Sequence, residues 1–398
     1  MSEMSYLEKL LDGVEVEWKT LGSIAELKRG TSITKKDVID GTIPVVAGGR
    51  TPAYYHNTSN RDGQTIVIAG SGAYAGFVSW WEEPIFVSDA FTVKPHNILL
   101  PRYCYHFLMN MQQQLHEFKS GGGVPHVYPR DVSPILIPIP CPDTPEKSLA
   151  IQSEIVRILD KFTALTAELT AELNMRKKQY NYYRDQLFSF NTEDVPHLPM
   201  GQKDIGEFIR GGTFQKKDFI DAGVGCIHYG QIYTYYGTYT EKTKTYISTA
   251  LAKKCKKAQK GDLIIATTSE NDEDVCKAVA WLGSEDIAVS SDACIYKHNL
   301  NPKYVSYFFQ TEQFQNQKRQ YITGAKVRRV NADNLSKILI PVPSMEIQER
   351  IVSILDKFDT LTNSITEGLP REIELRQKQY EYYRDLLFSF PKPETVSN

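Results

Sequence analysis

The chain has 398 residues, of which 41% are hydrophobic and 24% charged, a balance typical of folded proteins rather than disordered ones. Its 46 lysines and arginines are offset by 48 aspartates and glutamates, and the formal charge of −2 excludes a uniformly cationic nucleic-acid-binding surface. Any DNA binding must therefore come from local patches, and the length admits two or three domains of about 150 residues.

The cysteines and the hydropathy indicate a soluble, cytoplasmic protein. No CxxC pair occurs, which argues against zinc ribbons and disulfide frameworks and suits a reducing compartment. No stretch reaches the ~18 apolar residues of a membrane span, and the first residues lack the apolar run of a signal peptide. We expect structural thiols at all six cysteines: Cys104, Cys141, Cys226, Cys255, Cys276 and Cys294.

The sequence repeats itself. Two blocks recur almost unchanged, and two further matches lie upstream of them in the same order. The matching segments are KRGTSITKKDVID (28–40) with IRGGTFQKKDFID (209–221), ILIPIP (135–140) with ILIPVP (338–343), IVRILDKF (155–162) with IVSILDKF (351–358), and RKKQYNYYRDQLFSF (176–190) with RQKQYEYYRDLLFSF (376–390). Agreement at four places indicates a tandem duplication.

In chain order, each copy is predicted to be a mixed, strand-rich module followed by a long helix, which makes the fold class α+β. The glycine-rich stretch AGSGAYAG (69–76) lacks GxGxxG spacing and precedes the strand-like FVSWW, so it favours a turn between strands over a nucleotide loop. The predicted segments are an N-terminal segment with the first module (1–143), a central helix (144–190), the second module (191–343), a distal helix (344–390) and a tail (391–398).

The long helices are predicted from apolar residues that recur every three or four positions. In the first helix this face runs from Ile151 to Leu187, with Thr144 as N-cap and Pro145 at the first helical position; the second begins after Ser344. About 45 residues at ~1.5 Å each give nearly 70 Å, which overhangs a small module. We therefore expect an antiparallel coiled coil with pseudo-twofold symmetry, in preference to helices that pack only on their own modules.

The two helices differ in length between their repeated blocks. The first carries the tetrads TAEL (166–169) and TAEL (170–173), whereas the second carries TNSI, TEGL and PREI (362–373). Four residues rotate the helix by ~400° and rise by ~6 Å, so one more tetrad is expected to add about a turn while nearly keeping the buried face. Gly368 and Pro370 are expected to kink the second helix.

Two variable modules, each followed by a repeated IVxxLDxF helix, make the whole chain resemble the specificity subunit of type I restriction-modification systems. The tandem TAELTAEL is similar to the IC subclass, in which the number of repeats is implied to set the spacing of a bipartite DNA target. The resemblance implies that double-stranded DNA, two methyltransferase subunits and restriction/translocase subunits are the partners. It also implies that S-adenosylmethionine, ATP and Mg belong to those partners, so no cofactor is expected here.

No catalytic motif contradicts this expectation. The sequence has no Asn- or Asp-Pro-Pro-aromatic tetrapeptide for a flipped adenine, no GxxxxGK phosphate loop, no HExxH and no paired-histidine metal spacing among its eight histidines. We predict a non-enzymatic protein.

Local charge marks candidate DNA contacts in the second module. Residues 241–260 hold seven lysines against one acid, and residues 318–329 hold five basic residues and no acid. Such runs are often ordinary solvated surface, but arginine forks suit guanine edges and Thr323-Gly324-Ala325 supplies a flexible approach. The candidates are Lys253, Lys254, Lys256, Lys257, Lys318, Arg319, Lys326, Arg328 and Arg329.

The corresponding place in the first module is SGGGVPHVYPRD (120–131), whose GGGVPHV aligns with GAKVRRV before the shared ILIP strand. Both resemble the glycine-containing loop that target-recognition modules present to DNA. Pro125 and His126 replace the two arginines, so the chemistry differs. The candidates here are Lys119, His126 and Arg130, with a structural hydrogen-bonding role for His126 as the alternative.

Tyrosines suggest two further surfaces. YTYYGTY (233–239) is expected to be sheet packing rather than DNA contact. The duplicated RxKQYxYYRD block is a candidate docking site for two identical partners, and the alternative is that it only closes the helices onto the modules. Its docking candidates are Tyr182, Tyr183, Arg184, Tyr382, Tyr383 and Arg384.

A function of another class stays open: a coiled-coil scaffold with two modules that bind protein or carbohydrate. The near-neutral charge and the 23 tyrosines favour it. Salt separates the two hypotheses, because contacts to several phosphates weaken steeply as salt rises.

Overall fold

A computed structural model describes residues 6–121 and 123–392, and the chain divides into two compact units. Unit 1 comprises residues 1–170 and 372–398, and unit 2 comprises residues 171–371. Each unit therefore takes residues from both halves of the duplicated sequence. Most of the predicted tail, residues 393–398, lies outside the described residues.

Unit 1 is a mixed α/β module. Its central antiparallel sheet has the order β2-β8-β5-β6, a smaller sheet has the order β4-β3-β7, and β1 pairs with β9. The strands are β1 (Val16–Thr20), β2 (Ala25–Arg29), β3 (Ile43–Val46), β4 (Tyr54–His56), β5 (Thr65–Ala69), β6 (Val78–Trp81), β7 (Phe86–Val87), β8 (Ala90–Pro95) and β9 (Leu136–Pro140); the short helices are α1 (Tyr6–Leu11), α2 (Leu21–Ile24), α3 (Pro101–Asn110), α4 (Gln112–Glu117) and α5 (Pro129–Val132).

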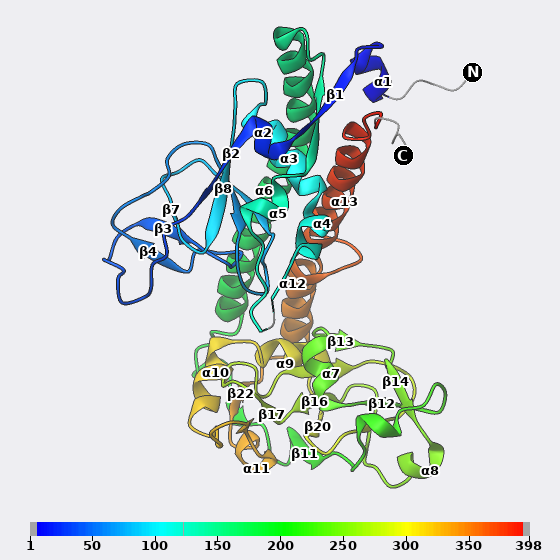
Figure 1. Cartoon of the computed structure of the whole chain (residues 1–398). Helices are drawn as coiled ribbons and strands as arrows, with labels where there is room; N and C mark the ends of the chain where they lie inside the picture. Colours follow the sequence, from blue (N-terminus) through cyan, green and yellow to red (C-terminus); the bar gives the residue numbers. More distant parts are fainter. Residues whose placement is uncertain (1–5, 122, 393–398) are drawn as a thin grey trace, which may run out of the picture. The chain divides into compact units, whose positions relative to one another are not determined.

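Unit 2 repeats this plan with a larger sheet of order β11-β20-β16-β18-β13, a second of order β14-β12-β19-β15, and the pairs β10-β22 and β17-β21 (Figure 1). The strands are β10 (His197–Pro199), β11 (Gly206–Arg210), β12 (Val224–Ile227), β13 (Tyr239–Thr240), β14 (Thr245–Ile247), β15 (Lys257–Ala258), β16 (Leu263–Ala266), β17 (Thr268–Ser269), β18 (Ala278–Trp281), β19 (Ile287–Val289), β20 (Ala293–His298), β21 (Arg328–Arg329) and β22 (Leu339–Pro341). The short helices are α7 (Tyr229–Thr234), α8 (Thr249–Ala252), α9 (Pro302–Phe308), α10 (Glu312–Arg319), α11 (Ala332–Leu335) and the 3-10 turn Lys216–Asp218.

Equivalent buried contacts hold both units together. In unit 1 the hydroxyl of Tyr103 donates to the carbonyl of Pro138, and in unit 2 Tyr304 donates in the same way to Pro341. A buried glutamine follows the same pattern. The side chain of Gln152 accepts from Leu100 N, and that of Gln348 accepts from Asn301 N, just before α3 and α9 begin. The two units thus share a framework down to single hydrogen bonds.

The first long helix, α6 (Pro145–Leu187), is continuous over 43 residues and begins at the proline that the sequence marks. The second is broken into α12 (Met345–Asn363) and α13 (Leu369–Leu387), so the prediction of one kinked helix is wrong. Gly368 has φ of +85°, and a Cβ there would lie 2.3 Å from the carbonyl oxygen of Thr360. Ser364 is already extended, and Pro370 has no N–H to donate.

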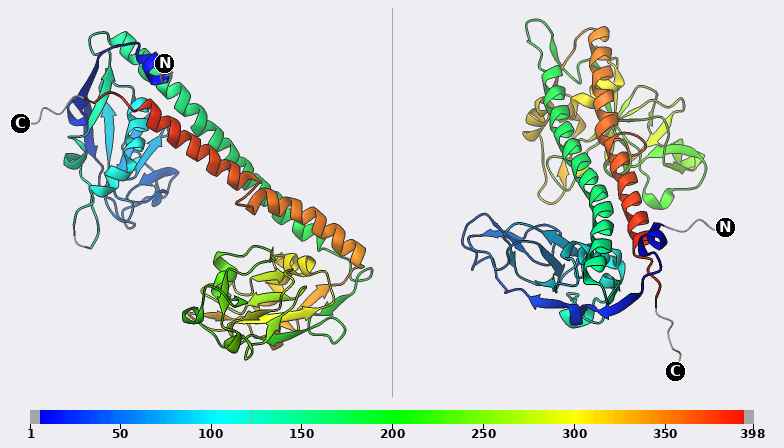
Figure 2. Two further views of the ribbon diagram at one scale, coloured as in Figure 1. Left: turned by 90° about the vertical axis from the view of Figure 1, so that its right-hand side faces the viewer. Right: turned by 90° about the horizontal axis from the view of Figure 1, so that it is seen from above.

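Each unit contains a pair of helical segments drawn from the two repeats. In unit 1 the first part of α6 lies beside α13 and runs in the opposite direction (Figure 2). Phe162 stacks on Tyr383 there, with ring centroids 5.1 Å apart. In unit 2 the last part of α6 lies beside α12, and Tyr183 stacks on Phe358 at 5.9 Å. The same two repeated blocks therefore meet in each unit with their roles exchanged.

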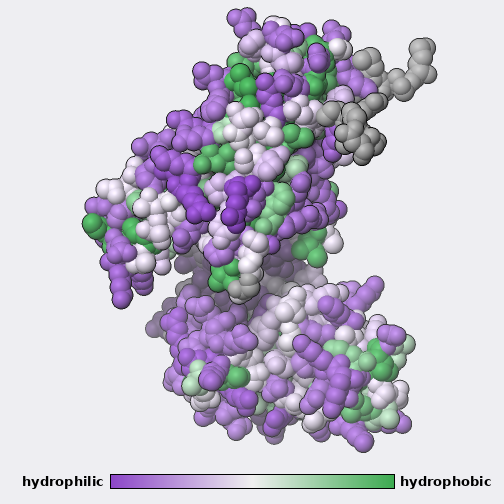
Figure 3. All heavy atoms as spheres, in the orientation of Figure 1, coloured by the Kyte–Doolittle hydropathy of each residue, from purple (hydrophilic) through white to green (hydrophobic). Residues whose placement is uncertain are grey.

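The remaining global expectations concern cysteines and hydropathy. All six cysteines are buried free thiols, and burial raises the pKa of Cys276 to about 12. Over the described residues, no helix combines the length and the hydropathy needed to cross a membrane. Figure 3 shows mainly hydrophilic side chains on the visible face, with hydrophobic ones only in small groups.

Candidate nucleic-acid interface

A tight hairpin lies between α10 and α11 of unit 2. Residues 323–329 turn back on themselves, because Thr323 and Arg329 exchange backbone hydrogen bonds of 2.9 Å. Gly324 makes this turn possible: its φ is +92°, and a Cβ would lie 2.1 Å from the carbonyl oxygen of Val327. Strand β21 then pairs with β17 and fixes the hairpin to the module.

The same hairpin occurs in unit 1. Ser120 and His126 exchange backbone hydrogen bonds of 3.0 and 2.9 Å, and His126 also bridges to Ser71. Gly121 has φ of +106°, like its counterpart Gly324. Just after the hairpins, Val127 N donates to Gly70 O in unit 1 and Val330 N donates to Thr267 O in unit 2, each over 3.1 Å. The two loops that align in sequence therefore also share their backbone hydrogen bonds and their glycine corner. The side chains that they carry differ.

Three predicted residues around the unit 2 hairpin are exposed: Arg319, Lys326 and Arg329. Arg328 instead forms an ion pair of 2.8 Å with Asp272 and donates to the carbonyl oxygen of Gly324. Among the described residues, the guanidinium of Arg329 has no hydrogen-bond or ion-pair partner. The two adjacent arginines thus have different surroundings.

The prediction that Lys318 contacts DNA is wrong. Its side chain is 0% exposed, and its ammonium group donates to the carbonyl oxygens of Glu273 (3.1 Å) and Val275 (2.9 Å). Burial lowers the pKa of Lys318. A buried ammonium group with two internal acceptors fixes local structure and cannot reach a phosphate.

The second basic group lies around the end of α8 and the start of β15. Lys253, Lys254 and Lys256 are exposed and Lys257 is half-buried, while Cys255 between them is buried. None of these four lysines forms an ion pair with a residue of the described part of the chain. Uncompensated ammonium groups of this kind suit phosphate contacts, which fix position without reading sequence.

In unit 1 the hairpin carries an aromatic and cationic stack. The ring of His126 stacks on Tyr128 at 5.7 Å with an interplanar angle of 10°. The guanidinium groups of Arg130 and Arg29 lie 4.9 and 5.3 Å from the centre of the same tyrosine ring. Lys119 is tied back by a hydrogen bond of 2.8 Å to the carbonyl oxygen of Ala73. The stack, rather than a free arginine fork, is the most distinctive chemistry here.

Two members of this stack were missed from the sequence. Tyr128 lies two residues after His126, so its position in the loop was a usable signal. Arg29 comes from the end of β2, and only the pairing of β2 with β8 and β8 with β5 brings it to the loop. A hollow of about 490 Å³ beside the stack is lined by Arg29, His126, Tyr128 and the small residues Gly30, Ser32 and Ser71.

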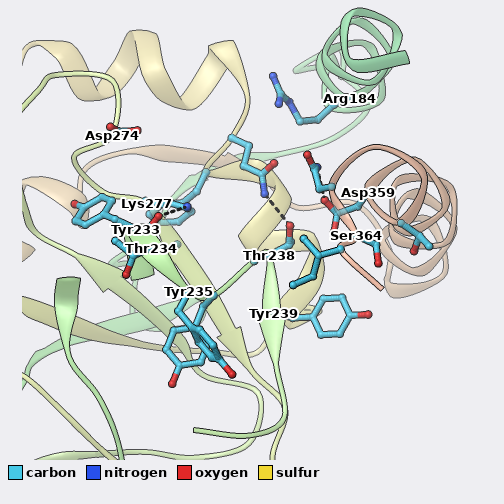
Figure 4. Close-up of a pocket in the computed structure, with 18 of the residues that line it drawn as sticks. Arg184, Tyr233, Thr234, Tyr235, Thr238, Tyr239, Asp274, Lys277, Asp359 and Ser364 are labelled. Carbon is cyan, nitrogen blue, oxygen red and sulfur yellow. Dashed lines mark hydrogen bonds between the residues drawn. The ribbon is translucent and has the colours of Figure 1, made fainter. Parts of the chain in front are cut away.

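The tyrosine-rich segment of unit 2 borders a larger hollow. Its residues are mostly helix α7 and a loop, so the prediction of alternating strand packing is wrong; only Tyr239 is in a strand. The hollow, about 870 Å³, is polar, with Tyr233, Tyr235, Lys277 and Asp359 around it (Figure 4). Tyr233 donates to the carbonyl oxygen of Thr268 at the base of β17. Burial raises the pKa of Asp359.

The predicted docking residues fall into two groups: exposed tyrosine rings, and arginines whose side chains have internal partners. The exposed fraction is 61% for Tyr182 and 64% for Tyr382, while Tyr183 and Tyr383 are partly covered by their stacks on phenylalanine. A hollow of about 380 Å³ in unit 1 is lined by Leu375, Tyr382, Tyr383 and the polar residues around them.

Arg184 and Arg384 do not belong to that exposed surface. Arg384 donates to the side chain of Asn110 and to the carbonyl oxygen of Met109, both over 3.1 Å. Arg184 is 8% exposed and lies over the ring of Tyr180. For Arg384 the alternative interpretation is supported, because its contacts close α13 onto the module. The side chain of Arg184 is buried, and its hydrogen bonds go to Asn181 and Asp185 of its own helix.

The same helices are anchored by networks of buried and half-buried polar groups. In unit 1 Asp160 accepts from Arg102 and binds His106, both over 2.7 Å, and His106 also meets the hydroxyl of Tyr380. Burial lowers the pKa of His106 despite the neighbouring carboxylate. In unit 2 Asp356 plays the corresponding part for Lys303 and Tyr307.

Over the described residues, no group of three or more His, Cys, Asp or Glu side chains is placed to hold a metal ion. The stretch 69–76 is a turn between β5 and β6 with Gly72 and Gly76 at positive φ, as predicted, rather than a phosphate loop. The candidate functional residues of both units are therefore those of the two hairpins and of the nearby basic groups.

Comparison with known proteins decides the family. The family model described as the type I restriction modification DNA specificity domain matches residues 13–176 and 199–375, one match per repeat. The chain belongs to this family.

Relatives among the specificity subunits span the whole chain. The specificity subunit of the type I restriction enzyme EcoR124I/EcoR124II of Escherichia coli is 42% identical over 424 residues, covering 100% of both chains. A putative type I specificity subunit of Haemophilus influenzae is 33% identical and covers 97% of this chain and 98% of its own.

Solved structures agree on the fold. The specificity subunit of a type I restriction-modification system from M. genitalium has a TM-score of 0.57 at 16% identity, covering 98% of this chain and 100% of its own. A chain from a study of complex assembly and conformational transition in the type I system has a TM-score of 0.58 at 14% identity, covering 94% and 98%. These likenesses concern the fold alone.

Proposed function

We propose that the chain is the DNA-reading, non-catalytic specificity subunit of a type I restriction-modification complex, acting in the cytoplasm. Each unit reads one half of a bipartite, asymmetric target in double-stranded DNA. The observation that carries the proposal is that two equivalent hairpins present different side chains: Lys326 and Arg329 in unit 2, and the His126 and Tyr128 stack in unit 1. Equal scaffolds with unequal chemistry suit two unlike half-sites.

The long helices supply the geometry of the proposed complex. We propose that α6, α12 and α13 form one antiparallel coiled coil with pseudo-twofold symmetry, whose length sets the unread gap between half-sites, as in the IC subclass. The exchanged pairs Phe162–Tyr383 and Phe358–Tyr183 support this arrangement. The predicted segments 1–143, 144–190, 191–343 and 344–390 would then be two recognition modules and two spacer helices.

Catalysis belongs to partners in this proposal. Two methyltransferase subunits dock on the duplicated exposed tyrosines, Tyr182 and Tyr382, and modify an adenine in each half-site with S-adenosylmethionine. Restriction/translocase subunits, which use ATP and Mg, cut unmethylated DNA. The chain itself needs no cofactor for reading. Lys119, Arg130, Arg319 and the lysines 253, 254, 256 and 257 serve as positioning contacts to phosphates.

The test is reconstitution of the purified chain with its methyltransferase subunit. The mixture is expected to methylate a bipartite sequence, and DNA binding is expected to weaken steeply between about 50 and 200 mM salt, because phosphate contacts release counterions. Tyr182→Ala with Tyr382→Ala should reduce complex formation without lowering stability, since both rings are mostly exposed. Failure to assemble, or salt-independent binding of a neutral ligand by the modules, would contradict the proposal.

A further inference from the structure

We infer that Arg328 and Arg329 have separate tasks: Arg328 is a positioning residue that fixes the 323–329 hairpin, and Arg329, beside Lys326, contacts the DNA bases. Lys318 and Asp272 complete the fixing device. The inference rests on the proposed function and deepens it, because it names the residues that determine specificity in the half-site read by unit 2.

The first contact that fixes the hairpin involves the buried ammonium group of Lys318. Its two hydrogen bonds, to the carbonyl oxygens of Glu273 and Val275, hold the end of the turn 270–275, of which residues 270–274 are exposed. Within this turn Asn271 and Asp274 bond to each other through backbone and side chain, over 2.7 Å in both contacts. Removing a partner from a buried ammonium group is costly, so the turn cannot drift freely.

The turn then holds the hairpin through Asp272. The carboxylate lies 2.8 Å from Nε of Arg328, and the same guanidinium donates to the carbonyl oxygen of Gly324 across the hairpin. Both contacts are within unit 2, and together they connect the turn 270–275, strand β21 and the corner of the hairpin at Gly324. Asp272 offsets part of the positive charge of Arg328, and both Nε and Nη1 of the guanidinium are already used in internal contacts, which leaves it less suited than Arg329 to bind a phosphate or a guanine.

Arg329 differs in each respect. Successive residues of a strand point to opposite sides, so fixing Arg328 toward Asp272 directs Arg329 the other way. Arg329 is exposed, and its guanidinium is unpartnered among the described residues. A free planar fork on a fixed strand is suited to the N7 and O6 acceptors of guanine in the major groove.

The first repeat provides an internal comparison. In unit 1 the position of Arg328 is taken by Pro125, whose ring fixes φ without any partner. The corresponding turn, residues 70–76, contains no acid, whereas residues 270–274 contain four. The arginine and its acidic partner are present together in one unit and absent together in the other. Such joint presence is expected if Arg328 and Asp272 act as a pair that fixes the hairpin. An arginine that only reads a base would not need an acidic partner.

The experiment is a charge swap. Wild type, Arg329→Gln, Arg328→Asp, Asp272→Arg and the double variant Asp272→Arg with Arg328→Asp are each assembled with the methyltransferase subunit. Each complex then methylates a duplex library with randomised positions, and the methylated molecules are sequenced. Thermal unfolding and the base preferences of the half-site read by unit 1 show whether each variant is folded.

Arg329→Gln should lose discrimination at one position of the unit 2 half-site by about 5- to 140-fold, the equivalent of ~1–3 kcal/mol for a bidentate base contact. Arg328→Asp and Asp272→Arg should each lower modification at all positions of that half-site. The double variant should recover most of this loss, because the pair is restored with exchanged signs.

Two results would overturn the inference: a double variant as impaired as Arg328→Asp, which would mean that Arg328 itself reads DNA, or unchanged specificity in Arg329→Gln. If the wild-type complex selects no bipartite sequence, the proposed function itself fails. That outcome is distinguishable, because it occurs before any variant is compared.

Discussion

The position of a basic residue on its helix decides whether it can meet DNA. Lys318 and Arg319 are neighbours in sequence, yet one is buried and the other exposed. Lys318 follows Phe314 by four residues on α10, and residues four apart share a helix face. The same spacing links Tyr180 with Arg184 and Tyr380 with Arg384, so an aromatic residue one turn earlier was a usable sequence signal for all three closed side chains.

Loop contacts were beyond the reach of the sequence. The alignment of GGGVPHV with GAKVRRV predicted two equivalent glycine-containing loops, and in the structure both are hairpins with a glycine of positive φ at the corner. It did not predict that Asp272 pairs with Arg328 or that Arg29 meets Tyr128. Those contacts depend on strand order, which brings residues from distant segments together, and local spacing carries no information on it.

A half-buried histidine, His298, gives unit 2 a pH dependence. Burial of the imidazole lowers the pKa of His298 to about 4, and its buried Nε2 atom has no hydrogen-bond partner among the described residues. The unfolded chain binds a proton near pH 6.5 and the folded chain does not, so this contribution to stability is full above pH 6.5 and is lost as the pH falls toward 4.

We predict that the free energy of unfolding falls between pH 7.5 and 5 by an amount that includes about 1 to 2 kcal/mol from His298. Nδ1 of His298 accepts a hydrogen bond from the backbone N–H of Leu300. His298→Asn keeps an acceptor for this N–H, but the asparagine side chain cannot titrate. Urea unfolding at the two pH values measures the difference. The variant should show a smaller fall than the wild type, and equal falls would contradict the assignment.

At the scale of elements, the broken second helix is the clearest departure from expectation. Four more residues separate its repeated blocks than in the first helix, and an added helical turn was predicted. Instead, residues 364–368 leave the helix. The hydroxyl of Ser364 accepts from the backbone N–H groups of Thr366 and Glu367, which favours a turn over another helical turn. Gly368 and Pro370 marked the location of the break in the sequence, but they did not indicate that five residues would leave the helix.

Gly368→Ala is therefore expected to destabilise the protein. The positive φ and the close approach to Thr360 O both penalise a Cβ, and together they should cost about 1 to 3 kcal/mol of unfolding free energy. Gly237→Ala is the matched control, because nothing lies within 4 Å of its added Cβ, and it should change stability by less than about 0.5 kcal/mol. Chemical unfolding of the three proteins measures both, and similar losses in the two variants would contradict the role of Gly368.

At the scale of the whole molecule, each unit is completed by the helix of the other repeat. Phe388 and Phe390, at the end of the second repeat, are in the core of unit 1, and Trp18 donates to the carbonyl oxygen of Pro391. Phe188, from the first repeat, is in the core of unit 2. The duplicated LFSF motif was visible in the sequence, but its exchange between units follows from the pairing of helices. Each repeat by itself therefore lacks part of a core.

The whole-molecule prediction concerns the length of α6. Inserting a third TAEL after Leu173 adds ~6 Å and ~400° of rotation, so the apolar face is nearly kept. In the proposed coiled coil, the non-helical residues 364–368 allow α12 and α13 to adjust to the longer α6. The unread gap should lengthen by about two base pairs, since ~6 Å corresponds to roughly two steps of ~3.4 Å, while both half-sites stay the same.

Methylome sequencing of cells that carry the insertion and the partner subunits measures the gap and the half-sites separately. Glu168→Gln with Glu172→Gln is the matched control, because it alters both TAEL tetrads without changing their length, and it should leave the gap unchanged. Altered half-site bases with an unaltered gap would contradict the spacer role. A longer gap in the control would show that charge rather than length acts on it. Only a change confined to the insertion variant and to the gap assigns the spacing to the helix, because the two hairpins proposed to read the half-sites are untouched by either change.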